Sequence, residues 1–243
     1  MTAIEGRGTD EATWLGWQDL GTWPQLDLSE CPRAVVVAPH PDDEVLGVGG
    51  ILASLSAGGV AVVVVAVTDG EASHPGSAVV ERQALAEQRT GESLRALADL
   101  ALDPGSRLRL RQPDGQVAEP DLARTLARLL RAGDWCFATW RGDGHPDHEA
   151  VGRAAAAACR QVGARLFEFP VWSWHWARPG DDRVPWQRAA VVALDDVAAA
   201  RKRLALTRFV SQTAPMGTGA GDAAILPPHV LARFERRFET VFR

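Results

Sequence analysis

The chain has 243 residues, of which 46% are hydrophobic and 23% are charged, and its formal net charge at pH 7 is −5. This composition is typical of a globular domain with a sizeable core, and it excludes a disordered chain. The charge is mildly negative and the densest basic stretch, residues 201–203, is short, so we expect no nucleic-acid partner.

Cysteine usage and the lack of long apolar runs indicate the compartment. Cys31, Cys136 and Cys159 form no CxxC pair, which predicts buried thiols in a reducing environment rather than a disulfide framework. Residues 1–23 lack the basic start and apolar stretch of a secretory signal, and no apolar run is long enough to span a bilayer. We therefore expect a cytoplasmic protein without a membrane span. The sequence does not decide whether it forms a homo-oligomer.

Hydrophobic patterning predicts strands that alternate with helices over the first 170 residues. The clearest strand is 34–38, a continuous β-branched run of the kind found in central parallel strands. This alternation predicts a Rossmann-like, three-layer α/β/α fold with a mostly parallel sheet and right-handed crossovers. The other strands are expected at 60–67, 108–111, 135–139 and 165–169, and the helices at 44–57, 79–100, 121–132 and 149–162.

The pattern changes past residue 170. An edge strand is expected at 189–194, and helices at 195–209 and 228–242 close the chain. Residues 1–30 are expected to form an irregular N-terminal extension, whose Trp14 and Trp17 pack back on a single domain of residues 31–243.

Two polar motifs follow strands of the predicted sheet. The motif HPDDE occupies residues 40–44, directly after the strand 34–38, and the motif HPDH occupies residues 145–148. Ligands of open α/β sheets bind beyond the carboxyl ends of the strands, where the two motifs can converge. Catalytic zinc sites use three protein ligands, typically imidazole and carboxylate, and leave one position for water. The motifs therefore predict a metal site, in which the adjacent Asp42 and Asp43 point in different directions and divide metal binding from base catalysis.

These motifs resemble those of the LmbE-like (PIG-L) family of zinc-dependent N-deacetylases. Related enzymes act on N-acetylglucosaminyl phosphatidylinositol, on the mycothiol and bacillithiol precursors, and on glycopeptide antibiotics. Both family motifs, His-Pro-Asp-Asp-Glu and His-x-Asp-His, are complete here. The resemblance runs in order from about residue 33 to 212, because it also includes Thr68-Asp69-Gly70-Glu71, Arg89-Thr90-Gly91-Glu92 and Ser211-Gln212.

The resemblance implies a role for each polar residue of the two motifs. Asp42 would be the general base that deprotonates the attacking water. His145 would stabilise the oxyanion and protonate the departing amine, and Asp147 would orient a neighbouring histidine. Zinc is the implied cofactor, although His/Asp sites accept several divalent metals. The implied zinc ligands are His40, Asp43 and His148.

Outside the motifs, the resemblance implies that Arg89 and Asp114 contact the sugar hydroxyls. From the residues alone, Arg89 would be a surface residue or a helix ion pair, and Asp114 a turn former. The chain contains no tyrosine, whereas some relatives place a mobile Tyr just before the second motif. We therefore expect His145 to carry more of the oxyanion role, or Arg141 to help.

The expected function is hydrolysis of an N-acyl (acetyl) amide on an N-acetylglucosaminyl-type conjugate, a small-molecule partner. An amidase that acts on larger sugar-linked amides, such as thiol conjugates, is the alternative with the same mechanism. Residues 47–50 (GVGG) suggest a nucleotide- or ligand-binding protein instead, but the third glycine of GxGxxG is Leu52. These glycines favour close packing of a helix on the sheet. The Trp172, Trp174 and Trp176 side chains either form a wall for a sugar or lipid-like group or serve only in packing.

Overall fold

The computed structural model describes residues 6–243, and its centre is a sheet of seven strands in the order β3-β2-β1-β4-β5-β7-β6. Strands β1 to β5 pair in parallel, whereas β7 is antiparallel to both β5 and β6. The predicted mostly parallel α/β fold is therefore confirmed. The strands are β1 (Arg33–Ala38), β2 (Ala61–Ala66), β3 (Arg107–Arg109), β4 (Trp135–Thr139), β5 (Arg165–Phe169), β6 (Ala189–Ala193) and β7 (Phe238–Phe242).

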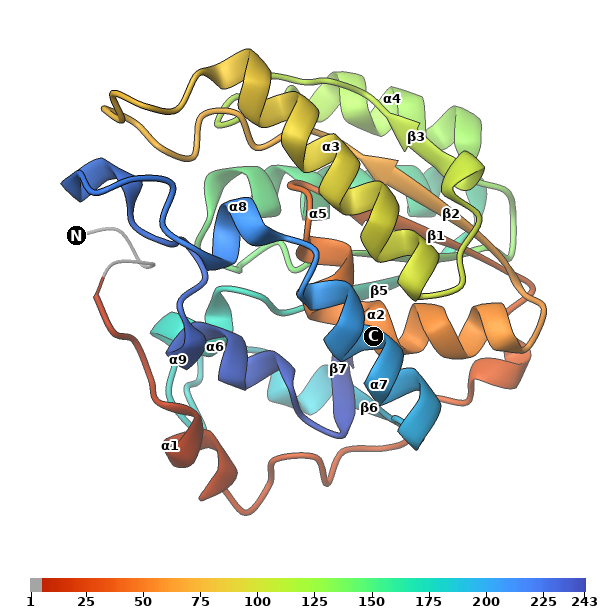
Figure 1. The fold of residues 1–243 in the computed structure, drawn as a ribbon. Helices are drawn as coiled ribbons and strands as arrows, with labels where there is room; N and C mark the ends of the chain where they lie inside the picture. Colours follow the sequence, from red (N-terminus) through yellow and green to blue (C-terminus); the bar gives the residue numbers. More distant parts are fainter. Residues whose placement is uncertain (1–5) are drawn as a thin grey trace.

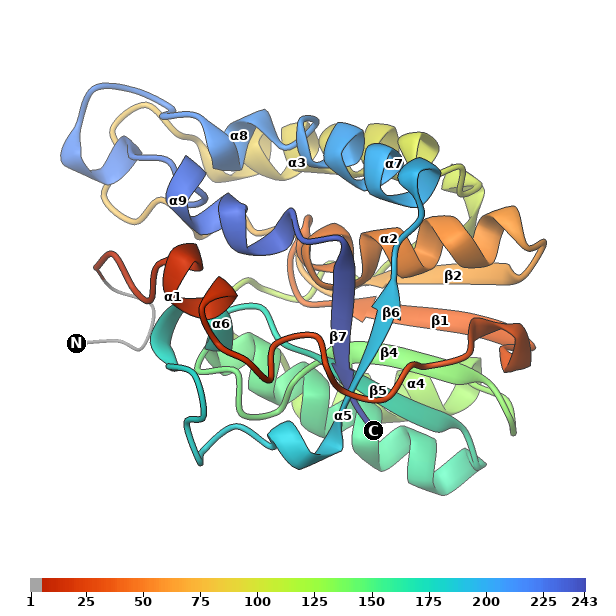
Figure 2. The same ribbon diagram turned by 90° about the horizontal axis from the view of Figure 1, so that it is seen from below.

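Helices cover both faces of the sheet (Figures 1 and 2). One face carries α2 (Asp43–Ala57), α3 (Arg82–Asp99) and α7 (Asp196–Leu206), and the other carries α4 (Glu119–Leu129) and α5 (Pro146–Val162). In the described part of the chain, none of the helices has both the length and the apolar character needed to cross a bilayer. The short helices are α1 (Glu11–Leu15), α6 (Ser173–Trp176), α8 (Val210–Thr213) and α9 (Pro228–Leu231), and single 3-10 turns lie at Leu28–Glu30, Pro104–Ser106, Trp186–Arg188, Ala220–Asp222 and Ala232–Phe234.

The valine-rich central strands are buried on both faces. Val36 belongs to the core on the side of α2 and α3, and its neighbours Val35 and Val37 belong to the core on the side of α4 and α5. Successive side chains of a strand point to opposite faces, so a strand covered on both sides reads as an unbroken apolar run. This burial fixes the position of β1 and the turn that follows it.

Two glycines let α2 approach the sheet and its neighbours closely. A Cβ atom on Gly47 would lie 2.1 Å from the ring of Phe169, and one on Gly50 would lie 2.4 Å from the side chain of Leu194. The glycines therefore serve helix packing, as the sequence predicted.

A buried ion pair holds a kink in α2. Val48 has non-helical angles (φ −139°, ψ 18°), which frees backbone groups on either side of it. Glu239 of β7 accepts the N–H groups of residues 50 and 51 at 2.8 and 2.7 Å. Lys202 of α7 donates to the Leu46 carbonyl at 2.8 Å and to Glu239 at 2.7 Å. The pair thus replaces the hydrogen bonds that the kink removes.

The predicted C-terminal helix 228–242 is wrong. Helix α9 ends at Leu231, and residues 238–242 form strand β7, which pairs with β6 along its whole length. Aromatic and β-branched residues of this segment favour a strand, and the pairing with distant β6 decides the outcome. β6 lies at the edge of the sheet as predicted. Helix α5 begins at Pro146, three residues earlier than expected, so the second motif lies in its first turn.

The N-terminal segment packs back on the domain. Trp14 is fully buried and lies edge-on to Trp174, with ring centroids 4.9 Å apart, and Trp17 packs against the same core. Gln25 forms a parallel bridge with Val191 of β6. Residues 1–5 of the predicted extension lie outside the described residues, and the boundary at residue 30 stays a prediction. The three cysteines are buried and unpaired, as expected.

Candidate metal and catalytic site

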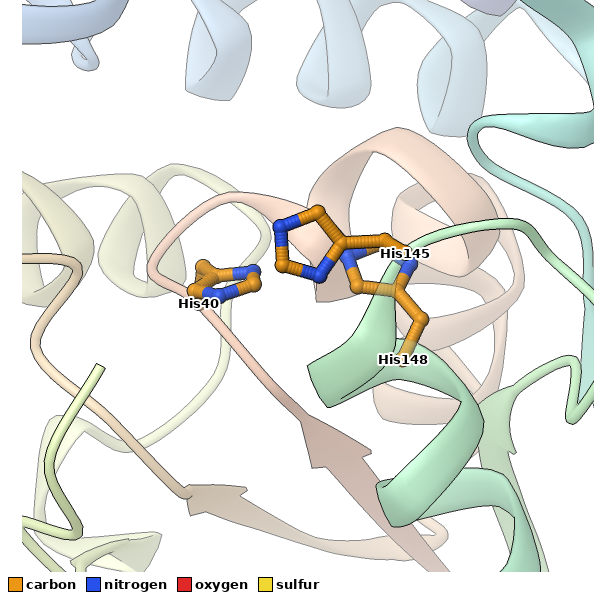
Figure 3. A group of neighbouring side chains, drawn as sticks. All are labelled: His40, His145 and His148. Carbon is orange, nitrogen blue, oxygen red and sulfur yellow. The ribbon is translucent and has the colours of Figure 1, made fainter. Parts of the chain in front are cut away.

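The two polar motifs meet at the carboxyl ends of β1 and β4, at the centre of the sheet. His40 lies in the turn after β1, His145 caps the N-terminus of α5, and His148 lies in its first turn. The ring centroid of His40 lies 4.8 Å from that of His145 and 5.3 Å from that of His148. Figure 3 shows the three rings gathered at one point, with nitrogen atoms within 4.8 Å of one another. The predicted convergence of the motifs is therefore observed.

The Asp43 carboxylate lies between two of these imidazoles. Its Oδ2 atom is 3.2 Å from His40 Nδ1 and 3.3 Å from His148 Nε2. His148 Nε2 is buried and makes no hydrogen bond to any described residue, although it forms an ion-pair contact with Asp43. Two ligands of one tetrahedral zinc ion lie about 3.4 Å apart. The spacing and the unused nitrogen fit a divalent cation between the three side chains.

A second set of carboxylates holds the other side of the His40 ring. His40 Nε2 lies 3.2 Å from Asp114 Oδ1 and 3.3 Å from Asp147 Oδ2. Asp147 is fixed in turn by the N–H groups of Gly115 and Val117. A proton on Nε2 satisfies these carboxylates and leaves the lone pair on Nδ1 facing Asp43. Asp147 therefore contacts one of the site histidines, which is His40.

Asp143 orients His148, and the sequence analysis missed it. Its carboxylate is fully buried and accepts from His148 Nδ1 at 2.8 Å. It also accepts three backbone N–H groups, from Val171, Trp172 and Ser173, at 2.8 to 3.0 Å. The only signal in the sequence is an acidic residue between two glycines just before the second motif. When the ring is neutral, the bond to Asp143 keeps the His148 proton on Nδ1 and leaves the lone pair of Nε2 facing the cluster.

Asp42 has a strained backbone beside the metal ligands. Its φ of 129° lies in a region that non-glycine residues rarely adopt, and the residue is only 4% exposed. Two hydrogen bonds stabilise this backbone conformation: Glu44 accepts the Asp42 N–H at 3.2 Å, and Gln212 donates to the Pro41 carbonyl. Such strain concentrates at functional sites. Asp42 and Asp43 both line the cavity, and Asp43 also contacts the imidazoles of His40 and His148.

The cluster separates the pKa values of its histidines. Burial alone would lower the pKa of His148, but the carboxylates of Asp43 and Asp143 raise it to about 9. Burial, together with repulsion from His148 and His40, lowers the pKa of His145 to about 3. Without a cation, the His145 imidazole is therefore neutral at pH 7, while the His148 imidazole is protonated on both nitrogens and positively charged. Imidazoles with opposite shifts in one site indicate different roles.

A cavity of about 460 Å³ opens over the cluster, and both residues expected to bind the sugar line it. Arg89 is 1% exposed and donates to the Gly70 carbonyl at 2.7 Å and to Ser211 Oγ at 3.3 Å. Its Nη2 atom is buried and has no hydrogen-bond partner among residues 6–243. Asp114 accepts the Ala72 N–H at 2.8 Å and contacts His40, so it is more than a turn former.

Other side chains near the site have different roles from those considered in the sequence analysis. Arg141 binds Glu168 through two bonds of 2.7 and 2.9 Å and does not line the described cavity, so a part in oxyanion binding is not supported. Trp172 does line the cavity, together with His175 and His229, which no sequence pattern had connected to it. Trp174 and Trp176 pack elsewhere, in the core and against its edge.

The fold and the site define a three-layer α/β protein with a buried His/Asp cluster, suited to a divalent cation, at the carboxyl ends of its central strands. Residues 35–159 match the family model of GlcNAc-PI de-N-acetylase (PIG-L), and the chain belongs to this family.

Similar proteins include two 1D-myo-inositol 2-acetamido-2-deoxy-alpha-D-glucopyranoside deacetylases. The one from Mycolicibacterium gilvum is 31% identical over 197 residues, 69% of this chain, and the one from Kineococcus radiotolerans is 28% identical over 202 residues, 68% of this chain. The chain spans 66% and 53% of their respective lengths, which is less than two thirds of each. The N,N'-diacetylchitobiose deacetylase of Pyrococcus horikoshii has the same fold, with a TM-score of 0.57 over 82% of this chain and 76% of its own, at 19% identity.

Proposed function

We propose that this chain is a zinc-dependent N-deacetylase that hydrolyses the acetamido group of an N-acetylglucosaminyl-type conjugate. The observation that carries the proposal is the Asp43 carboxylate between His40 and His148, with the strained Asp42 next to it. Membership of the GlcNAc-PI de-N-acetylase family supports it, as do the two similar proteins that are deacetylases of an acetamido sugar.

In this proposal His40, Asp43 and His148 hold the metal, which is zinc or another divalent ion. When bound, zinc lowers the pKa of a water ligand to about 7 and polarises the acyl oxygen. A rival set of ligands replaces Asp43 with His145, since the three imidazoles also lie close together. We favour Asp43 because its Oδ2 is at ligand spacing from both histidines, whereas His145 already accepts the Asp147 N–H through Nδ1.

Asp42 acts as the general base that takes a proton from the attacking water. Burial and the Asp43 carboxylate raise the pKa of Asp42 in the absence of a cation. A divalent charge bound to Asp43 would act in the opposite direction and keep Asp42 ionised. A base in this position contributes roughly 10²–10⁴ in rate.

His145 stabilises the oxyanion and passes a proton to the departing amine. Its Nδ1 atom accepts the Asp147 N–H at 3.2 Å, so the proton of the neutral ring is on Nε2. A neutral ring is expected because burial lowers the pKa of His145 to about 3. A donor aimed at the developing oxyanion is worth about 3 kcal/mol.

Arg89 and Asp114 bind the sugar. Arg89 and Asp114 both line the cavity next to the metal ligands, and the buried Nη2 of Arg89 has no hydrogen-bond partner among the described residues. A donor and an acceptor that line the same cavity suit the hydroxyl groups of a sugar ring. An amidase for larger sugar-linked amides would use the same residues, and release of acetate from the conjugates tested below distinguishes a deacetylase from it.

The test combines metal analysis with one substitution. The purified protein should contain about one zinc ion per chain and release acetate from a panel of N-acetylglucosaminyl conjugates. Asp42→Asn should retain the metal and lose turnover, whereas Asp121→Asn, on the exposed side of α4, should change neither. A protein that binds NAD and no metal, or an Asp42→Asn variant as active as the parent, would contradict the proposal.

A further inference from the structure

Two polar motifs that are far apart in the sequence, one in α3 and one in α8, lie against each other in the fold. Arg89 and Glu92 are about one turn apart in α3, and Ser211 and Gln212 are neighbours in the short helix α8. The two helices lie side by side (Figures 1 and 2). All four residues are at most 3% exposed. Polar side chains buried to this extent need hydrogen-bond partners, so their bonds show what each of them holds in place.

Ser211 links Glu92 to Arg89. The Glu92 carboxylate accepts the Ser211 N–H at 3.0 Å and the Ser211 hydroxyl proton at 2.7 Å. The oxygen of that hydroxyl accepts in turn from Arg89 Nε at 3.3 Å. A carboxylate only accepts and a guanidinium only donates, so the hydroxyl between them is the one group that can do both. The direction of each bond in this chain is therefore fixed.

Two hydrogen bonds orient the Arg89 guanidinium. Nε donates to Ser211, and Nη1 donates to the Gly70 carbonyl at 2.7 Å. Gly70 permits this contact because a Cβ atom there would lie 2.2 Å from Nη1. The guanidinium is planar and rigid, so two fixed nitrogens also fix Nη2, the buried donor without a partner among the described residues. Ser211 thus helps to determine where the remaining donor of Arg89 lies.

Gln212 holds the peptide unit that joins Pro41 to the strained Asp42. Its Nε2 donates to the carbonyl of this peptide unit, and Glu44 accepts the N–H of the same unit at 3.2 Å. A peptide unit is planar, so bonds at its oxygen and at its N–H together fix the plane. The φ of 129° at Asp42 is the rotation about the next bond after this plane. Without the bond from Gln212, the plane can rotate and relieve the strain.

We infer that the Ser211-Gln212 pair is a positioning element for the proposed reaction. Ser211 orients Arg89, which binds the sugar. Gln212 orients the backbone of Asp42, which acts as the general base. The inference rests on the proposed function and deepens it, because it adds residues that act through the sugar-binding and base residues. Since both positioning residues lie in one turn of α8, the packing of this helix sets the two functional side chains relative to each other.

Ser211→Ala tests the link to Arg89. On the N-acetylglucosaminyl conjugate that the parent hydrolyses best, KM should rise by about tenfold or more, because a hydrogen bond to a charged group is lost. kcat and the zinc content should stay close to those of the parent, as expected when only binding is weakened. The same substitution made in an Arg89→Met protein should cause no further change in kcat/KM, because Ser211 acts through Arg89.

Gln212→Met tests the link to Asp42. Its kcat should fall by roughly 10- to 100-fold, because a displaced base is poorly aligned with the attacking water. KM and the zinc content should stay close to those of the parent. In an Asp42→Asn protein, whose residual rate lacks the base, Gln212→Met should cause no further loss. If Gln212→Met does not fold, Gln212→Asn serves instead, because its amide is one methylene farther from the Pro41 carbonyl.

Thr213→Val, in the same turn of α8, is the matched control. Its hydroxyl donates to the Phe209 carbonyl at 3.1 Å, within the helix. Loss of this bond should leave kcat and KM unchanged. Urea unfolding of every variant shows whether a change in rate merely follows a loss of stability.

The outcomes distinguish the inference from the proposed function. Ser211→Ala with the same effect in the parent and in Arg89→Met would overturn the inference, since Ser211 would then act independently. An effect of Gln212→Met that persists in full in Asp42→Asn would overturn it in the same way, and so would single variants with the kinetics of the parent or with losses that Thr213→Val matches. A parent protein that hydrolyses none of the conjugates would overturn the proposed function, and the inference with it.

Discussion

The buried Asp143 carboxylate gives a sharp prediction about the metal site. In Asp143→Asn, one oxygen becomes an NH₂ group, so two of the four N–H donors that point at this side chain lose their acceptor. If the amide faces His148, the ring must move its proton to Nε2, the atom that we expect to bind metal. If the amide is flipped, Val171 and Ser173 lose their bonds and the loop after β5 loosens.

Each buried donor left without a partner costs about 1–3 kcal/mol. With two such donors, Asp143→Asn without metal should have an unfolding free energy roughly 2–6 kcal/mol lower than that of the parent without metal. Metal affinity should fall by about 10- to 100-fold, the usual effect of removing a residue that orients a ligand histidine. Urea unfolding and competition with a chromophoric chelator measure the two quantities. Asp134→Asn, at a buried aspartate paired with Arg33 away from the site, should lower stability without changing metal affinity. Unchanged metal affinity in a folded Asp143→Asn protein would refute the role given to this residue.

Three further predictions concern the scaffold and its charges. Lys202→Met leaves Glu239 buried and unpaired and should cost about 3–5 kcal/mol in urea unfolding, whereas the double variant Lys202→Met/Glu239→Gln should cost less than the sum of the single changes. Gly47→Ala places a methyl group against Phe169 and should cost about 1–3 kcal/mol by the same assay; equal stability would mean that α2 can shift freely. Because the folded-state pKa of His148 is raised to about 9, its stabilisation of the chelator-treated protein is complete below about pH 6.5 and is lost as the pH rises through 9. Unfolding free energies at pH 6 to 9 should therefore fall with pH in this form, and a flat profile in that range would contradict the ion pairs of His148 with Asp43 and Asp143.

The sequence predicted the structure correctly where the local hydrophobic pattern matches the burial of the segment in the fold. Strands β1 and β4 were placed correctly because strands buried on both faces are nearly continuous apolar runs. The meeting of the two motifs followed from the parallel sheet, which brings the carboxyl ends of β1 and β4 together. Local patterning therefore sufficed for the centre of the fold and for the position of the site.

The errors arose where distant contacts decide. Residues 238–242 become a strand because β6 offers a partner, while the charged residues before them read as part of a helix. Asp143 sits in a glycine-flanked loop that resembles an ordinary turn, and only the fold brings it against His148 and the N–H groups after β5. Arg89 looks like a surface residue of a charged helix, yet its burial beside Gly70 and Ser211 depends on how α3 and α8 pack.

The most direct measurement is anomalous diffraction at the zinc edge from crystals of the zinc-loaded protein. We predict one ion per chain in contact with His40 Nδ1, an Asp43 oxygen and His148 Nε2, with Asp42 close by and not a ligand. An ion bound by His145 in place of Asp43, or no ion between these side chains, would contradict the assignment of Asp43 as a metal ligand and Asp42 as the general base.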